Sequence, residues 1–120
     1  MMAENTSTDP LARQAQLFKL LTHPARLAIL EELRRDEACV CHLEAALGLR
    51  QAYLSQQLAV LRAAGLLLDR RDGWNVYYSI ADHAIFDLLD ISRQVLGISA
   101  SQPAKSRAAA CPCPKCTPAG

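Results

Sequence analysis

Five cysteines carry the most distinctive chemistry of this 120-residue chain. Cys39 and Cys41 form a Cys-Val-Cys element, and three more stand in the C-terminal run CPCPKC: Cys111, Cys113 and Cys116. Thiolates bind soft metal ions and are also open to oxidation. The chain has no apolar run long enough to span a membrane and no signal-peptide pattern, so we expect a cytoplasmic protein that does not act at a membrane. Cysteines stay reduced there, which favours metal binding or redox sensing over structural disulfides.

The number of thiols predicts a metal site built from two parts of the chain. Residues two apart on a regular helix point about 200° apart, so Cys39 and Cys41 can share an ion only if the first helical turn is unwound. Two thiolates are also too few for tight binding of a soft ion. The linker from Gly97 to Cys111 reaches at most roughly 45 Å, enough for either protomer of a dimer. We therefore expect a composite site of Cys39, Cys41 and one or two tail cysteines. The tail thiols could instead form a separate site or be inert, and the Cys pair could be a cap and a core residue.

Residues 38–65 must position the Cys-Val-Cys element, and their pattern predicts a helix-turn-helix. Val40, Leu43 and Leu47 share one helical face, and Gly48 suits a helix end. A second helix follows, with an apolar seam and a glycine stop: Leu54, Leu58, Leu61 and Gly65. Its other face carries long polar side chains able to reach base edges or phosphates: Gln51, Tyr53, Gln56 and Gln57. Two helices joined by a short glycine-containing turn form a helix-turn-helix.

The flanking segments complete a winged helix. Helices are expected near residues 11–21 and 24–35, and Asp72-Gly73 predicts a hairpin turn whose tip bears arginines. The following strand places Trp74, Val76, Tyr78 and Ile80 on one face and Asn75, Tyr77 and Ser79 on the other. A last helix after Asp82 has an apolar stripe that, with the first helix, suits a dimer interface. The expected fold class is mainly α with a small β-hairpin, about five helices plus the wing, and homodimeric. The expected parts are a frayed N-terminus over residues 1–10, the DNA-binding and dimerisation domain over 11–97, and a flexible Cys-rich tail over 98–120.

Charge and residue patterns limit the classes of function that we expect for this protein. The formal net charge of +1 argues only weakly for DNA binding. Basic residues nevertheless gather on the second helix of the helix-turn-helix and on the wing, and a dimer would add two such patches. There is no paired acid/base arrangement, no glycine-rich phosphate loop and no nucleophile with matching partners, so an enzyme is not expected.

These elements together resemble the ArsR/SmtB family of winged-helix metal-responsive repressors over about residues 11–97. The resemblance rests on LTHPARLAIL, ACVCHLEAALGL, QAYLSQQLAVLRAAGLL and DGWNVYYSI. The Cys-Val-Cys element is similar to the ELCVCDL motif of members that sense arsenite or cadmium and lead. The resemblance implies a homodimer that binds double-stranded operator DNA with an inverted repeat and leaves it on binding metal, so that a resistance or efflux operon is transcribed. It carries DNA-reading roles to the second helix and the wing: Gln51, Tyr53, Ser55, Gln56, Gln57, Arg70 and Arg71.

Several departures from the family pattern bear on the ligand. Arg50 stands where a serine commonly begins the recognition helix, which loses a cap but adds a charge for a phosphate. Gln57 replaces a frequent histidine, so operator preference does not transfer. Glu44 stands where the arsenite-type motif has a third cysteine, and Asp82 and His83 lack the later histidines of a zinc site in the last helix. Members of the cadmium/lead type also complete their site with a Cys-bearing tail. Cd(II) or Pb(II) is therefore slightly favoured over As(III) or Sb(III) as the inducer.

Two other functions remain open for the same fold. A thiol redox or persulfide-responsive repressor would form a disulfide between Cys39 or Cys41 and the tail, and oxidant alone would release it. A protein-interaction module would not bind DNA, which the polar helix face and the arginines of the wing argue against. His42 could serve as a further ligand, although an exposed helical histidine is the simpler expectation.

Overall fold

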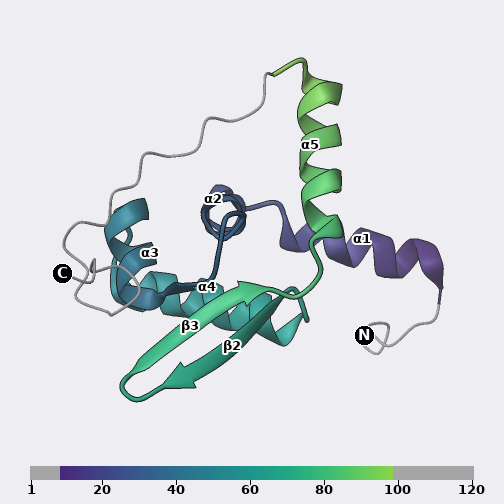
Figure 1. The fold of residues 1–120 in the computed structure, drawn as a ribbon. Coiled ribbons are helices and arrows are strands. Elements are labelled where there is room, and N and C mark those ends of the chain that lie inside the picture. The colour runs from purple at the N-terminus through teal and green to yellow at the C-terminus, as the bar shows by residue number, and fades with distance from the viewer. Residues whose placement is uncertain (1–8, 99–120) are drawn as a thin grey trace.

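The computed structural model describes residues 9–98, and these form a winged helix (Figure 1). The elements in chain order are α1 (Pro10–Leu20), α2 (Pro24–Glu32), β1 (Ala38–Cys39), α3 (Val40–Leu47), α4 (Gln51–Ala63), β2 (Leu67–Asp72), β3 (Asn75–Ile80) and α5 (Ala84–Leu96). Five helices and a small antiparallel sheet within this range confirm the predicted winged helix-turn-helix. Residues 1–8 of the expected N-terminal segment and residues 99–120 of the expected tail lie outside the described residues.

The helix-turn-helix forms because its leucines recur at helical spacing on both sides of one glycine turn. Gly48 ends α3 at φ 66°, a left-handed conformation that favours glycine, and its N–H bonds to the Glu44 carbonyl at 2.9 Å. Leu43, Leu54 and Leu58 are fully buried in one apolar cluster with residues of α2, β2 and α5. This core fixes α4 against α2 and α3, so the rotation of α4 about its own axis is determined by packing.

The three strands form an antiparallel sheet in the order β1-β3-β2. Asp72 pairs with Asn75, so the two-residue turn is Gly73-Trp74 and not Asp72-Gly73. Gly73 has φ +65° at the first turn position, which suits a hairpin turn that begins with glycine. The prediction that Trp74 shares a sheet face with Val76 is therefore wrong, because Trp74 lies in the turn and its side chain is 98% exposed.

A closed set of ion pairs holds α5 against the end of α2. The Arg34 guanidinium contacts Glu31 at 2.9 Å and Asp90 at 2.8 Å, and Arg93 contacts the same two carboxylates at 2.6 and 3.2 Å. Arg34 also stacks on Phe86 of α5, 4.5 Å from the ring centroid. Burial by itself raises the pKa of Glu31, but hydrogen bonds from Arg34 and Arg93 outweigh it and hold that pKa below its ordinary 4.5. The hydrogen bond from Arg34 likewise lowers the pKa of Asp90.

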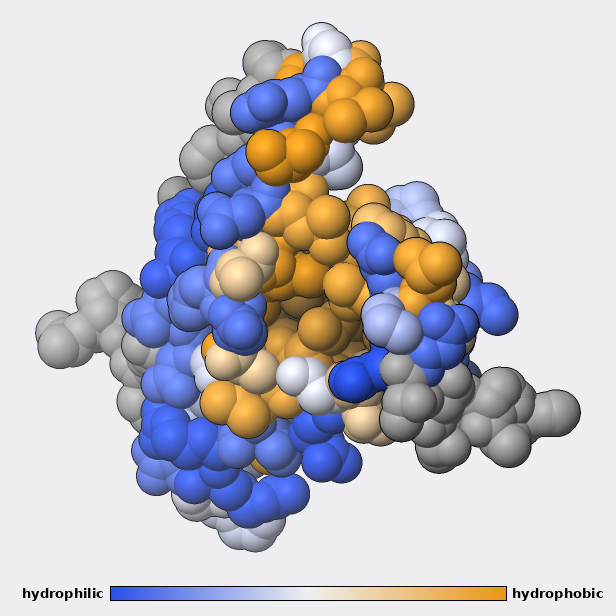
Figure 2. Space-filling view, turned by 90° about the vertical axis from the view of Figure 1, so that its right-hand side faces the viewer, coloured by the Kyte–Doolittle hydropathy of each residue, from blue (hydrophilic) through white to orange (hydrophobic). Residues whose placement is uncertain are grey.

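Beyond this contact, α1 and α5 leave apolar side chains in solvent. Figure 2 shows a broad hydrophobic patch with a hollow near its centre on the side of the molecule where these two helices lie. The exposed apolar residues on the two helices and just after α5 are Leu11, Phe18, Ile91, Val95, Leu96 and Ile98. An exposed apolar patch of this kind on a small domain marks an interaction surface.

Candidate DNA-binding surface and thiol pair

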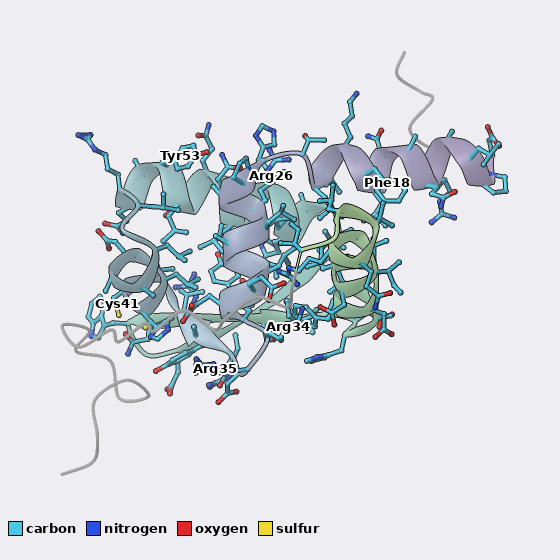
Figure 3. All side chains as sticks on the ribbon, turned by 90° about the horizontal axis from the view of Figure 1, so that it is seen from above. Phe18, Arg26, Arg34, Arg35, Cys41 and Tyr53 are labelled. Atoms are coloured by element: carbon cyan, nitrogen blue, oxygen red, sulfur yellow. The ribbon has the colours of Figure 1, made fainter. Side chains whose placement is uncertain are left out.

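The outer face of α4 presents polar side chains in the way that major-groove reading requires. Four of the residues assigned there from sequence are exposed: Gln51, Tyr53, Ser55 and Gln56. Arg50 is the residue before the helix and is also exposed, and its side chain makes no capping hydrogen bond. It is therefore available for a phosphate. Figure 3 shows Tyr53 at the upper edge of the view and Cys41 below it, toward the lower left.

Gln57 does not belong to that face, and the prediction that placed it there is wrong. Its side chain is 7% exposed, and its Oε1 accepts a hydrogen bond from Nε of Arg26 at 2.7 Å. Arg26 comes from α2 and also donates through Nη1 to the carbonyl of Leu20, at 3.2 Å (Figure 3). A buried side-chain amide is normally hydrogen-bonded, and here the bond between Gln57 and Arg26 connects α4 to α2. Gln57 lies three residues after Leu54, on the edge of the apolar seam, which is the signal in the sequence that could have revealed this.

The two arginines of the wing differ in their surroundings. Arg71 is exposed next to the hairpin turn. Arg70 makes two contacts to the Glu37 carboxylate, Nη2 to Oε2 at 2.6 Å and Nε to Oε1 at 3.2 Å. Its guanidinium also lies 4.6 Å from the centroid of the Tyr77 ring. The hydrogen bond to Glu37 raises the pKa of Arg70, which stays charged throughout the accessible pH range. Nothing local in the sequence connects Glu37 to residue 70, so this pair was missed.

The two sulfur atoms of the Cys-Val-Cys element converge, and that of Cys41 takes part in a disulfide bond. Cys39 is the residue before α3, with extended backbone angles (φ −84°, ψ 166°), and its Sγ accepts from the N–H of His42 at 3.4 Å. Because Cys39 is not helical, the angle of about 200° expected between helical neighbours two apart does not apply. The Sγ atoms of Cys39 and Cys41 lie 2.8 Å apart. Cys39 is 1% exposed and Cys41 is partly buried, so the pair sits at the surface edge of the domain.

Beside the thiols, His42 is held in place and partly buried. Its Nε2 lies 3.0 Å from Oε2 of Glu32 on α2, and its side chain is 21% exposed. The expectation of an exposed helical histidine is therefore wrong. Among residues 9–98 no group of three or more His, Cys, Asp or Glu side chains is arranged to hold a metal ion. The predicted tail ligands Cys111, Cys113 and Cys116 lie outside the described residues.

This arrangement defines a class of protein: a winged helix-turn-helix with an exposed polar recognition helix and an arginine-bearing wing. Comparison with known proteins narrows the class. Residues 23–67 match the family described as bacterial regulatory protein, arsR family. An uncharacterised HTH-type transcriptional regulator of Mycobacterium tuberculosis, Rv0081, is 47% identical over 91 residues, covering 74% of this chain and 80% of that protein. The chain belongs to the ArsR/SmtB family; it is a transcriptional regulator and not an enzyme.

Further relatives and a solved structure agree with this assignment. A transcriptional repressor SmtB homolog of Synechocystis is 41% identical over 85 residues, covering 71% of this chain, which spans 64% of that relative's length. The arsenical resistance operon repressor of Escherichia coli is 48% identical over 71 residues, covering 57% of this chain and 59% of that protein. The crystal structure of Rv0081 superposes with a TM-score of 0.68 at 44% identity, covering 76% of this chain and 92% of that one. No helix in residues 9–98 is long and apolar enough to span a membrane.

Proposed function

We propose that this regulator is a homodimeric repressor that binds an operator in double-stranded DNA and is released when a thiophilic ion binds its cysteines. The observation that carries the proposal is the convergence of the Cys39 and Cys41 sulfur atoms at the start of α3, the helix that precedes the recognition helix. Relatives named as an SmtB repressor homolog and an arsenical resistance operon repressor support repression and a metal or metalloid inducer.

DNA binding is assigned to the exposed face of α4 and to the wing. In a helix-turn-helix the second helix lies in the major groove, where amides and hydroxyls read base edges and arginines contact phosphates. The proposed contacts are Arg50, Gln51, Tyr53, Ser55, Gln56 and Arg71. Joining two protomers through the apolar patch on α1 and α5 would present two α4 helices to the two halves of an inverted repeat.

The thiol pair fits one part of a soft-ion site. Its two sulfurs lie close enough to face one ion, and thiolate is the donor that Cd(II), Pb(II) and trivalent arsenic prefer. Completion of the site by Cys111, Cys113 or Cys116 of the tail stays part of the proposal. The positive charge of a bound ion would stabilise thiolates that lie close together. Glu44, in place of a third cysteine, favours Cd(II) or Pb(II) slightly over As(III) or Sb(III).

Operator release by an ion tests this function directly. An operator would first be selected from a random-sequence DNA library with the reduced full-length protein, and its binding followed by fluorescence anisotropy. Cadmium, lead, arsenite, antimonite and zinc would then be titrated against the wild type, Cys39→Ser/Cys41→Ser, and a chain truncated before Cys111. Ser92→Ala, a change in α5 remote from the thiols, is the control variant.

The expected result is release by one thiophilic ion, lost in the double serine variant and weakened by truncation, with Ser92→Ala unchanged. Release by that ion in the double serine variant would contradict the thiol site. Release by oxidant alone, with no response to any ion, would replace the metal proposal with the thiol redox or persulfide one.

A further inference from the structure

The thiol pair is joined to the wing through the sheet as well as to the recognition helix through α3. Cys39 belongs to β1, which pairs antiparallel with β3, the central strand of the sheet. In that register Cys39 lies opposite Tyr77, and on the other side of β3 Tyr77 lies opposite Arg70 of β2. Residues directly opposite each other in an antiparallel pair project from the same face. Cys39, Tyr77 and Arg70 therefore form one row across the three strands, which we call the thiol–wing row.

The thiol–wing row lies on the face of the sheet away from the leucine core. Ala38 packs into that core, so its neighbour Cys39 must project from the other face, because side chains alternate along a strand. Tyr78 packs against the core in the same way, which places Tyr77 on the face of Cys39. Tyr77 is nevertheless 2% exposed. The Arg70 guanidinium over its ring covers part of it.

Glu37 forms a second connection between the segment before β1 and the wing. It stands two residues before Cys39, and both oxygens of its carboxylate accept hydrogen bonds from the Arg70 guanidinium. A paired fork of this kind fixes orientation as well as distance. The backbone between Glu37 and Cys39 is therefore tied to the wing in two ways, by the β1–β3 ladder and by this ion pair. A shift of Cys39 cannot leave the wing in place unless one of these connections breaks.

We propose that Glu37 and Arg70 are positioning residues that make the wing follow the chemistry of Cys39 and Cys41. In this role Arg70 orients the wing through Glu37 and Tyr77, and Arg71 is the phosphate contact. The proposal rests on the proposed function, because it describes how that thiol site regulates DNA binding. It reassigns Arg70, for which the resemblance implied a direct DNA contact. The alternative is that Arg70 contacts a phosphate and Glu37 only occupies it in the absence of DNA.

Matched variants separate the two roles by operator affinity with and without cadmium. For the wild type we expect cadmium to weaken operator binding by a factor in the usual allosteric range of roughly 5–150. In Glu37→Gln that factor should fall below about 3, with a cadmium-free affinity no higher than that of the wild type. In the control Arg71→Gln the cadmium factor should persist, while affinity falls and the slope of log K against log[salt] decreases by about 1.

A charge exchange distinguishes positioning from direct contact even if the single variants are affected in other ways. Glu37→Arg/Arg70→Glu keeps the ion pair and the net charge but removes the cation from residue 70. If the pair positions the wing, the exchange restores much of the cadmium factor lost in Glu37→Gln. If Arg70 contacts a phosphate, the exchange instead weakens operator binding strongly. An increase in affinity and salt slope in Glu37→Gln would also overturn the proposal, because it would mean that Glu37 competes with DNA.

A measurement without DNA keeps this inference distinct from the proposed function. Amide hydrogen exchange over residues 67–80 would be followed in the reduced, DNA-free protein with and without cadmium. We expect cadmium to change exchange in this segment of the wild type and of Arg71→Gln but not of Glu37→Gln. No change in the wild type would overturn the inference. A wild type that binds no operator defeats the repressor proposal, and the exchange result then decides the connection by itself.

Discussion

Replacing Gln57 tests whether this residue of the recognition helix reads DNA or holds the fold. Gln57→Leu removes the oxygen that accepts from Nε of Arg26 at 2.7 Å and leaves that charged donor facing an apolar side chain. Hydrogen bonds to charged groups contribute about 1.5–3 kcal/mol, so we expect a loss of about 2 kcal/mol in the free energy of unfolding. For a domain of this size that corresponds to a fall of roughly 8–16 °C in Tm.

The neighbouring Gln56 is the matched control, because it has the same side chain in an exposed position. Gln56→Leu should change stability by no more than about 0.5 kcal/mol. It should weaken operator binding by about 1–3 kcal/mol if it reads a base. Gln57→Glu keeps an acceptor for Arg26 and should melt close to the wild type. Melting would be followed by circular dichroism at one protein concentration, because the proposed dimerisation would make Tm concentration-dependent.

Two outcomes would refute the structural role of Gln57. One is a Gln57→Leu variant that melts like the wild type while losing as much operator affinity as Gln56→Leu. The other is strict additivity in the Arg26→Met/Gln57→Leu double variant. Removing both partners of a buried pair should cost less than the sum of the single losses.

Three further predictions concern stability and assembly. The folded-state pKa of Glu31 lies below its ordinary 4.5, so the stability that its ionised form contributes is present above about pH 4.5. This stability is lost as the pH falls through the folded-state pKa. Glu31→Gln should therefore make the loss of stability in acid less steep, as measured by melts between about pH 3 and 6. Val95 is 80% exposed on α5, so Val95→Glu should leave the protomer folded but shift sedimentation toward the monomer, unlike Gln94→Glu. Leu54→Ala removes a fully buried side chain and should cost about 2–5 kcal/mol in denaturant unfolding.

Each of these predictions has a contrary result. An acid transition of unchanged steepness in Glu31→Gln would mean that the ion pairs of Glu31 do not contribute to acid sensitivity. A Val95→Glu protein that remains dimeric would exclude this part of α5 from the interface. A Leu54→Ala loss below about 1 kcal/mol would contradict the packing described for the core.

The helical elements could be predicted because each has a signal within its own segment. Leu54, Leu58 and Leu61 repeat at helical spacing, and Gly48 marks the turn between the two helices. The hairpin was predicted from a glycine between two β-rich runs, but the position of its turn was wrong by one residue. Both Asp72-Gly73 and Gly73-Trp74 place a glycine where φ must be positive, so the glycine alone does not choose between them.

The contacts around the candidate site could not be predicted because they join residues far apart in the chain. Whether Gln57 faces solvent depends on Arg26, 31 residues earlier. Glu37 and Arg70 are 33 residues apart, and neither has a local pattern that marks a pair. The convergence of the thiols depends on β1, whose two residues are too few to show a strand periodicity. Without it, the sequence left open whether Cys39 lies inside the helix or at its cap.

The position of Trp74 determines how this protein must be observed. It is the chain's one tryptophan, and its ring is almost entirely in water in the folded state. Unfolding therefore hardly changes its surroundings, and a melt followed by tryptophan emission should show little transition while circular dichroism shows a clear one. Two probes that disagree in this way usually suggest an unfolding intermediate. Here the disagreement would arise from the location of the fluorophore, and a marked shift in its emission would report contact with the wing tip.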